Sequence, residues 1–485
     1  MAGSPENPSL TAWNSVYILL LKMWELTPDS CEAHPCLAGR ATRRAFLATA
    51  AASGLLCAAP AASRIGTFRS DVTPEPGEPL IWTKHAIQVD SLLWAKGVIL
   101  DSGGSRYVLC AVDWCAICNA THALFRNTIA KAAGTRADRV LVQAVHQHTA
   151  PYVDGSAYAL LERLPNPPLR MSEAFLGRAM ERLSRAVRDA AEQMSPFDQI
   201  GCGEAPVERV ASARRVRMPD GKLATRFSGS GNNPTMAALP EGSIDPMIKT
   251  IAFAAKGRTL ARLYYYATHP QTFCCDGHVS GDFVSDAREA LEKQEGIPQI
   301  YFTGCAGDVT VGKYNAGSAS RNGLAQRMEW GMRAAIAATR FQPASAITSR
   351  SANVVLPRPA SLPAKNVQDL AQMAAVGPAE GDNVYKSALR LAFANRREPL
   401  VATALKLGNI RILHLPGEPM LAFQEYAQRL RPRDFVAVAG YTDLGPGYLC
   451  TDRAWSEGGY EPSASNSGPG TEMALKGAIQ KVLTD

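Results

Sequence analysis

The chain has 485 residues, of which 46% are hydrophobic and 20% are charged, and its formal net charge is +7. This hydrophobic content is enough to bury a sizeable core, and it excludes collagenous, coiled-coil and largely disordered chains. Lysine and arginine are spread along the sequence without a basic cluster, so we expect a solvated surface and no nucleic-acid partner.

An export signal is predicted within residues 1–63. Arg43 and Arg44 precede an apolar, alanine-rich stretch that is too short and too rich in small residues to span a membrane comfortably, and residues 59–61 resemble a cleavage site. The arginine pair matches the twin-arginine pattern, which addresses a bacterial protein to the periplasm or the exterior. Residues 1–41 are expected to be a dispensable extension, and the mature chain is expected to have no transmembrane helix. The alternative for the apolar stretch is an ordinary core helix.

From residue 64 onward, hydrophobic patterns typical of strands and of helices alternate along the sequence. In the first half they predict a strand with a Pro/Gly-rich turn over 64–82, a hairpin over 97–114, a helix over 119–134, a strand over 139–145 and a helix over 172–194. In the second half they predict a hairpin over 250–269, a helix over 285–296, a strand with a Gly-rich loop over 298–310, a helix over 322–339, a hairpin over 401–419 and a helix over 420–430.

The order of these elements predicts the fold class. Strands and helices alternate with hairpins among them, so we expect an α/β protein with mixed β-sheets and helices packed on their outer faces. Residues 226–244 and 343–365 are expected to be the least ordered, because both are rich in Pro and Ser and the first also contains several Gly. Neither resembles a domain linker, so residues 64–485 are predicted to form a single large catalytic domain.

The cysteines are predicted to be mostly buried free thiols. Of the eleven, Cys31, Cys36 and Cys57 fall in or before the predicted signal, and most of the others lie in apolar contexts. Cys115 and Cys118 form a lone C-x-x-C with no second pair at zinc-finger spacing, where a strand is expected to turn into a helix. Disulfides remain open as an alternative.

Four predicted strands end in residues that bind metal ions or take part in hydrolysis. His146 and His148 are two residues apart, so an extended strand would place both on one face. Both could be ligands, or one could bind a metal ion while the other faces a substrate. The other three strands lead to His269, Glu418 and Tyr448. Zinc favours imidazole and carboxylate ligands, so these residues are candidate ligands, and only knowledge of the fold can assemble them into one site. Four further histidines are interpreted as hydrogen-bonded structural residues: His85, His122, His278 and His414.

Six stretches resemble, in the same order along the chain, the catalytic domain of the neutral, non-lysosomal ceramidases and their bacterial relatives. They are spread over nearly the whole range of residues 66–466. The stretches are FRSDVTPEPG, AVHQHTAP, ATHP with VSGDF, GCAGDVTVGKYN, HLPGEPM and GYLCTDRAWSEGGYEPSAS. The second, for example, is similar to the family's His-Thr-His-Ser-Gly-Pro, with Gln147 and Ala150 as substitutions. The resemblance implies a ceramidase-like fold.

The same resemblance implies a set of metal ligands. One zinc ion per chain would be held by His146, His269, Glu418 and Tyr448. His148 would then face the substrate and hydrogen-bond its carbonyl or the developing oxyanion.

Further roles follow from the same comparison of motifs. The family's Asn-Arg segment corresponds to Ala213 and Arg214, which implies Arg214 as a partner of the oxyanion, with Arg215 as the alternative. Tyr460 matches the second tyrosine of the last stretch and is a further catalytic candidate. His148 or a tyrosine is the candidate general acid.

Three more residues are assigned to substrate binding. Thr310 stands where the family has a serine, so attack of a zinc-bound water is favoured over a serine acyl-enzyme. Asp308 and Asp282 complete this assignment. The alternative for both aspartates is that they orient the metal ligands or cap helices.

The expected function is zinc-dependent hydrolysis of a linear, ceramide-like N-acyl amide. The expected partner is a small-molecule or lipid amide substrate, with peripheral membrane contact. The family's C-terminal immunoglobulin-like domain is expected to be absent, because the sequence ends shortly after Tyr460. The alternatives are an exported metal hydrolase acting on a different ester or amide, and a non-catalytic binding protein on the same scaffold.

Overall fold

The computed structural model describes residues 63–82, 84–377 and 381–484. The predicted export segment lies outside the described residues, apart from Ser63, so export stays a prediction. Within the described ranges, no helix has both the length and the hydrophobicity needed to cross a bilayer. Three larger sheets, of five, five and four strands, form the framework.

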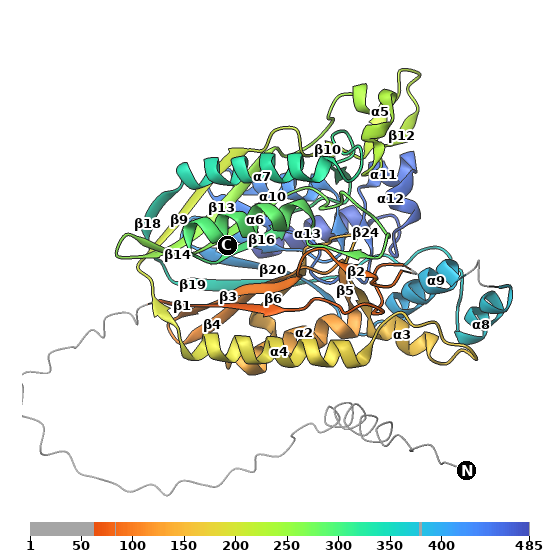
Figure 1. The fold of residues 1–485 in the computed structure, drawn as a ribbon, viewed down its shortest axis with the longest axis horizontal. Coiled ribbons are helices and arrows are strands. Elements are labelled where there is room, and N and C mark those ends of the chain that lie inside the picture. The colour runs from red at the N-terminus through yellow and green to blue at the C-terminus, as the bar shows by residue number, and fades with distance from the viewer. Residues whose placement is uncertain (1–62, 83, 378–380, 485) are drawn as a thin grey trace, which may run out of the picture. The chain divides into compact units, whose positions relative to one another are not determined.

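The first sheet has the strand order β6-β4-β3-β1-β8. Its strands are β1 (Arg64–Asp71), β3 (Trp94–Ser102), β4 (Ser105–Val112), β6 (Val140–Ala144) and β8 (Ser195–Pro196). Gly103 and Gly104 both have positive φ, which allows the two-residue turn between β3 and β4. The helices α2 (Asn119–Ala133) and α4 (Glu173–Glu192) lie along one face of this sheet (Figure 1). Because both faces of β4 are covered, its last six residues are all buried.

The second sheet has the order β16-β14-β13-β9-β18. Its strands are β9 (Gln199–Pro206), β13 (Met247–Ala255), β14 (Arg258–Tyr266), β16 (Gln299–Thr303) and β18 (Arg340–Pro343). The helix α6 (Asp282–Glu295) connects β14 to the parallel strand β16. Together with α7 (Ser320–Ala337), α6 covers the side of the molecule opposite α2 and α4 (Figure 1).

The third sheet has the order β19-β20-β21-β23. Its strands are β19 (Ile347–Val354), β20 (Leu400–Leu407), β21 (Ile410–His414) and β23 (Phe435–Ala439). The strand β19 falls within 343–365, where little order was expected, so that expectation is wrong. Only the two end residues of β19 are buried. The strand forms because its backbone pairs along its whole length with β20, a contact that a polar side-chain pattern does not reveal.

The remaining described elements are short or peripheral. The helices are α3 (Gly155–Leu161), α5 (Pro234–Ala238), α8 (Val367–Ala375), α9 (Gly381–Ala394), α10 (Leu421–Leu430), α11 (Asp452–Glu457), α12 (Tyr460–Ser463) and α13 (Thr471–Leu483), with 3₁₀ turns η1 (Ala137–Arg139) and η2 (Ser230–Asn232). The short strands are β2 (Gln88–Val89), β5 (Ala116–Cys118), β7 (Tyr152–Asp154), β10 (Ser212–Ala213), β11 (Arg215–Arg217), β12 (Leu223–Thr225), β15 (His278–Val279), β17 (Val309–Thr310), β22 (Glu418–Pro419) and β24 (Tyr448–Leu449).

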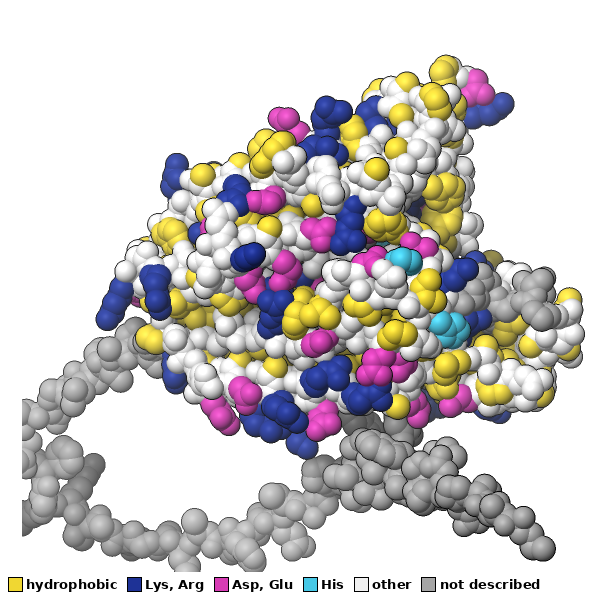
Figure 2. Space-filling view, in the orientation of Figure 1, with side chains coloured by type: hydrophobic (Ala, Val, Ile, Leu, Met, Phe, Trp, Pro, Cys, Tyr) yellow, Lys and Arg dark blue, Asp and Glu magenta, His cyan; other side chains and the backbone are white. Residues whose placement is uncertain are grey.

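The predicted α/β class with mixed sheets and outer helices is confirmed. The predicted helix ends also agree with the structure where local signals are strong. The side chain of Ser172 accepts a hydrogen bond from Phe175 N at the start of α4, and α2 ends at Gly134 with φ of 63°. On the face seen in Figure 2, basic and acidic side chains are interspersed, as expected for a solvated surface.

One buried side chain joins all three sheets. Gln143, on β6 of the first sheet, donates through Nε2 to Thr303 O of the second sheet and to Gly440 O, just after β23 of the third. Its Oε1 accepts from Thr303 N at 3.1 Å. Gln143 is fully buried, so these backbone groups have no water to replace it. The amide therefore fixes the strand ends of the three sheets against one another.

Replacing Gln143 by the apolar, similarly sized Met should lower the free energy of unfolding by about 2–5 kcal/mol, since Thr303 N and Gly440 O each lose a partner at about 1–3 kcal/mol. Urea unfolding followed by circular dichroism measures the change. Gln342→Met is the matched control, because the side-chain amide of Gln342 donates a hydrogen bond to Asn409 at an exposed position. Equal unfolding free energies for the two variants would contradict the role given to Gln143.

Candidate metal centre

Each of the three larger sheets contributes one residue to a buried cluster of acceptor atoms. His146 follows β6, His269 follows β14, and Glu418 follows the turn after β21. Glu418 Oε2 lies 3.3 Å from His146 Nε2 and 3.4 Å from His269 Nε2. All three side chains are buried. The structure thus brings together three of the four predicted metal ligands from positions far apart in the sequence.

His146 and His148, the two histidines of the HQH stretch (residues 146–148), lie close together, but not because they share a strand face. The strand β6 ends at Ala144, so His146 and His148 do not share a strand face, and that part of the prediction is wrong. Instead, His146 has φ of 78°, an uncommon left-handed conformation for a residue other than glycine. The resulting turn places His148 Nε2 3.2 Å from His146 Nε2. Backbone strain of this kind is typical of functional sites.

Hydrogen bonds on the far side of each ring fix which nitrogen faces Glu418. His146 Nδ1 donates to Cys115 O at 2.7 Å, and His269 Nδ1 donates to Val309 O at 3.0 Å. Both Nε2 lone pairs are therefore directed at the cluster. Glu418 Oε2 is buried and has no hydrogen-bond partner among the described residues. When both rings are neutral, three acceptor atoms converge, which fits a bound cation, and two imidazoles with a carboxylate suit zinc.

The pKa values of His146, Glu418 and His269 are shifted because these buried groups lie so close together. Burial opposes a charge on His146, but Glu418 and Cys115 together outweigh it and raise the pKa of His146 to about 10. Burial likewise opposes ionisation of Glu418, yet His146 and His269 hold its pKa well below the usual value. Burial and Arg214 lower the pKa of His269 to about 4. Without a metal ion, a proton on His146 therefore balances the carboxylate, and a bound cation would displace that proton.

The fourth predicted ligand, Tyr448, lies beside Glu418. The parallel strands β22 and β24 pair these two residues directly. Arg214 donates to the Tyr448 hydroxyl at 2.9 Å and to Gly307 O at 3.0 Å. Its other terminal nitrogen lies 3.1 Å from His269 Nε2. Arg214 therefore fixes both a predicted ligand and the edge of the cluster.

The other two predicted catalytic residues also border the cluster. Tyr460 packs its ring 5.7 Å from that of Tyr448 and 5.3 Å from the guanidinium carbon of Arg214. His148 is half-buried, and burial, with His146 next, lowers its pKa well below the usual value. Its ring is therefore neutral at pH 7 and carries a single N–H.

The alternative to Arg214 is placed elsewhere. Arg215 points away from the histidines and pairs with Glu461 at 2.9 Å and Glu457 at 3.1 Å. Of the two arginines, only Arg214 contacts the cluster.

The three residues assigned to substrate binding all accept hydrogen bonds from backbone N–H groups. Asp282 accepts from Thr272 N at 2.8 Å, and Asp308 accepts from Leu421 N at 2.8 Å at the start of α10. Thr310 Oγ1 accepts from Gly312 N at 3.0 Å. These contacts match the capping and orienting role that the sequence left open for the aspartates.

The four histidines interpreted as structural divide into two groups. His278 pairs with Asp90 at 3.0 Å, in keeping with that interpretation, and His85 is an exposed residue in a β-bridge. His122 lies 3.6 Å from Asp443, and its Nε2 has no hydrogen-bond partner among the described residues. His414 is buried, but neither ring nitrogen has a hydrogen-bond partner among the described residues. The prediction of a hydrogen-bonded His414 is therefore wrong; burial in the apolar core keeps its ring uncharged, with its pKa lowered to about 3.

Most of the described cysteines are buried free thiols, as predicted: Cys110, Cys115, Cys118, Cys305 and Cys450. Cys118 is the last residue of β5 and lies immediately before α2, which confirms the expected strand-to-helix position. One disulfide was not foreseen. It joins the neighbouring residues Cys274 and Cys275, and Cys275 N donates to His148 O at 3.4 Å. The loop that carries this pair therefore borders the cluster.

Sequence reasoning missed two residues that contact His146, namely Cys115 and Tyr441. The sulfur of Cys115 lies 3.8 Å from His146 Nδ1, on the side of the ring away from Glu418. Tyr441 stacks on the same ring. Tyr441 follows the apolar strand β23 and Gly440, so the strand-end pattern that located the other site residues could have located it.

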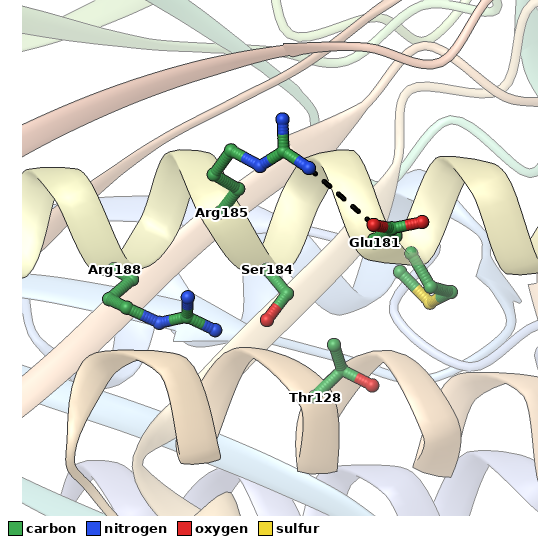
Figure 3. A pocket seen from close by; sticks show the side chains of 6 residues that line it. Thr128, Glu181, Ser184, Arg185 and Arg188 are labelled. Carbon is green, nitrogen blue, oxygen red and sulfur yellow. Dashed lines mark hydrogen bonds and ion pairs between the residues drawn. The ribbon is translucent and has the colours of Figure 1, made fainter.

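A surface groove lies away from these residues, between α2 and α4 (Figure 3). Thr128 comes from α2, and Ser184, Arg185 and Arg188 come from α4. Arg185 also forms an exposed ion pair with Glu181 at 3.5 Å. None of the predicted site residues lines this groove.

Known structures share this architecture, although sequence comparisons find no relative. No family model matches the chain, and neither does any curated protein. Two similar solved structures are a ceramidase complexed with C2 and the neutral ceramidase from Pseudomonas aeruginosa. Each is 17% identical with a TM-score of 0.66, over 86% of this chain and 74% and 73% of theirs, respectively. The chain therefore has the neutral ceramidase fold, as the resemblance implied.

Removing either kind of acceptor should abolish metal binding. The full chain loaded with zinc and desalted should retain about one ion, measured by plasma mass spectrometry, and both His269→Ala and Glu418→Gln should lose it, because a three-ligand site loses most of its affinity with one ligand. His278→Ala is the control, since His278 pairs with Asp90 outside the cluster. Equal zinc in Glu418→Gln and the unaltered chain would contradict this assignment.

Proposed function

We propose that this chain is a zinc-dependent hydrolase that cleaves a linear, ceramide-like N-acyl amide. The observation that carries the proposal is the buried Glu418 Oε2, which lies 3.3 Å from His146 Nε2 and 3.4 Å from His269 Nε2. The ceramidase fold supports the same conclusion, because the residues resembling that family's motifs meet at this cluster. Export through the twin-arginine signal and a single catalytic domain over 64–485 belong to this proposal.

The proposed zinc ligands are His146, His269 and Glu418, with Tyr448 beside them. When bound, zinc lowers the pKa of a water molecule to about 7 and polarises an amide carbonyl. Arg214 donates to the Tyr448 hydroxyl, and although burial raises the pKa of Tyr448, the guanidinium opposes that rise. Arg214 thereby favours the anionic form that suits a metal ligand.

The oxyanion would be held by donors of the chain. His148 is neutral, is only half-buried and lies next to the cluster, so its single N–H can be directed at a substrate carbonyl. Arg214 is positively charged and buried beside His269, where the low dielectric strengthens its attraction for developing negative charge. Tyr460 adds a hydroxyl at the same edge. Each group acts by hydrogen bonding or charge and needs no covalent intermediate.

An apolar approach to the cluster favours a lipid-like substrate. Phe227 is 53% exposed, and its ring packs edge-on against Tyr460 at 5.4 Å. Tyr460 in turn packs against Tyr448. This row of aromatic rings leads from the surface to the predicted ligands, and it offers an acyl chain a surface that excludes water.

The test is hydrolysis of N-acyl sphingosines of different chain length beside matched acyl esters, with zinc removed by chelation and then restored. Zinc-dependent release of the fatty acid from the amides is expected. His148→Asn should retain zinc and lower kcat about 10²–10³-fold, as the loss of one oxyanion donor does. His278→Asn is the matched control. A zinc-loaded chain that cleaves only esters would support the different hydrolase, and one that cleaves neither would support the binding protein.

A further inference from the structure

Tyr441 is a fully buried residue in an unusual backbone conformation beside the candidate metal centre. It follows β23 and Gly440, and its φ is 57°. A bulky side chain in this left-handed region costs about 1–3 kcal/mol, so it persists only where the surrounding structure imposes it. The mechanism proposed above gives Tyr441 no role.

Backbone hydrogen bonds on both sides impose that conformation. Tyr441 N donates to Gly417 O at 2.9 Å, next to Glu418. Tyr441 O accepts from Ala144 N at 3.0 Å, two residues before His146. The neighbouring residue Asp443 accepts through its backbone oxygen from Gly417 N at 2.8 Å. Tyr441 is thus bonded to both segments that carry metal ligands from the first and third sheets.

The ring of Tyr441 packs directly on the histidines. It is stacked on His146, with centroids 4.5 Å apart and an angle of 30° between the planes. It also meets His269 edge-on, with centroids 6.0 Å apart and an angle of 89°. The hydrogen bond from His146 Nδ1 to Cys115 O fixes one atom of the His146 ring. The stacked tyrosine restricts the remaining freedom, which is rotation of the ring about that bond.

The hydroxyl of Tyr441 forms none of these contacts. It is buried and has no hydrogen-bond partner among the described residues. A hydroxyl without a partner contributes no stabilising bond in a folded protein, so any role of this residue falls to its ring and its backbone.

We propose that Tyr441 is a positioning residue whose ring holds the imidazole of His146 in the orientation needed for metal binding. This inference rests on the proposed function, because it requires the zinc site. In this proposal the aromatic ring, held in place by the strained backbone, orients the His146 imidazole, and the hydroxyl does not contribute. Residues that orient metal ligands typically change metal affinity about 10–100-fold when replaced.

The test compares zinc dissociation constants, measured by competition with a chromophoric chelator, for the full chain and two variants. Tyr441→Phe keeps the ring and should bind zinc within about threefold of the unaltered chain, because it removes only an unpaired hydroxyl. Tyr441→Gly removes the ring while relieving the strain at positive φ, so it should fold and bind zinc about 10–100-fold more weakly. Hydrolysis of the N-acyl amide should fall in Tyr441→Gly in proportion to zinc occupancy and recover when zinc is raised.

Tyr265 supplies the matched control, because it is also a buried tyrosine with an unpaired hydroxyl, and it stacks on Phe302 instead of a histidine. Tyr265→Ala should lower the stability but leave the zinc affinity of the folded chain unchanged. Equal zinc affinity in Tyr441→Gly and the unaltered chain would overturn the inference and leave the proposed function intact. A loss of zinc affinity in Tyr441→Phe equal to that in Tyr441→Gly would overturn it too, since the hydroxyl would then be responsible. An unaltered chain without zinc affinity would overturn the proposed function as well.

Discussion

The buried amide of Gln143 is the constraint on which the candidate site depends. Gln143 lies on a strand of the first sheet, just before His146. Its amide nitrogen and oxygen hydrogen-bond to backbone groups of the second and third sheets. The three sheets have separate strand orders. The amide aligns their ends together with two backbone hydrogen bonds, from Ala144 N to Tyr441 O and from Gly440 N to Thr303 O, and the residues that follow β6, β14 and β21 meet as a result. The fold thereby turns three unrelated strand ends into one site.

The cluster that results needs a positive charge to balance Glu418, which a proton on His146 supplies when no metal ion is bound. Two imidazole nitrogens and a carboxylate oxygen face one another in a buried setting, and the folding energy of three sheets holds them there. Left-handed backbone at His146 and at Tyr441 adds strain at the same place. Proteins concentrate such costs where function requires them. A structural role alone would be served better by apolar side chains, so a cation is the simplest reason for this arrangement.

Much of this could be predicted from the sequence, and the limits have physical causes. The helices with clear caps and the hairpin at Gly103 and Gly104 follow local rules, so their bounds agree with the structure. The candidate ligands were located because each follows an apolar strand. Their convergence required the resemblance to a known family, since pairing between distant strands leaves no local pattern. The strand β19 was missed for the same reason.

Other features depend on three-dimensional contacts alone. Nothing in the sequence around Gln143 distinguishes an amide that joins three sheets from one that faces water. The left-handed turn at His146 was also hidden, because histidine does not mark such a turn as glycine would. The loop at Cys274 and Cys275 comes next to His148 only through the packing of the second sheet against the first.

The central claim is that two imidazoles and a carboxylate, without sulfur, hold a zinc ion. X-ray absorption at the zinc edge of the zinc-loaded chain tests it most directly, because sulfur scatters differently from nitrogen and oxygen and lies farther from the ion. The account predicts only nitrogen and oxygen neighbours at about 2.0–2.2 Å. A sulfur neighbour at about 2.3 Å would place the ion instead among Cys115, His146 and His148, and would contradict the account.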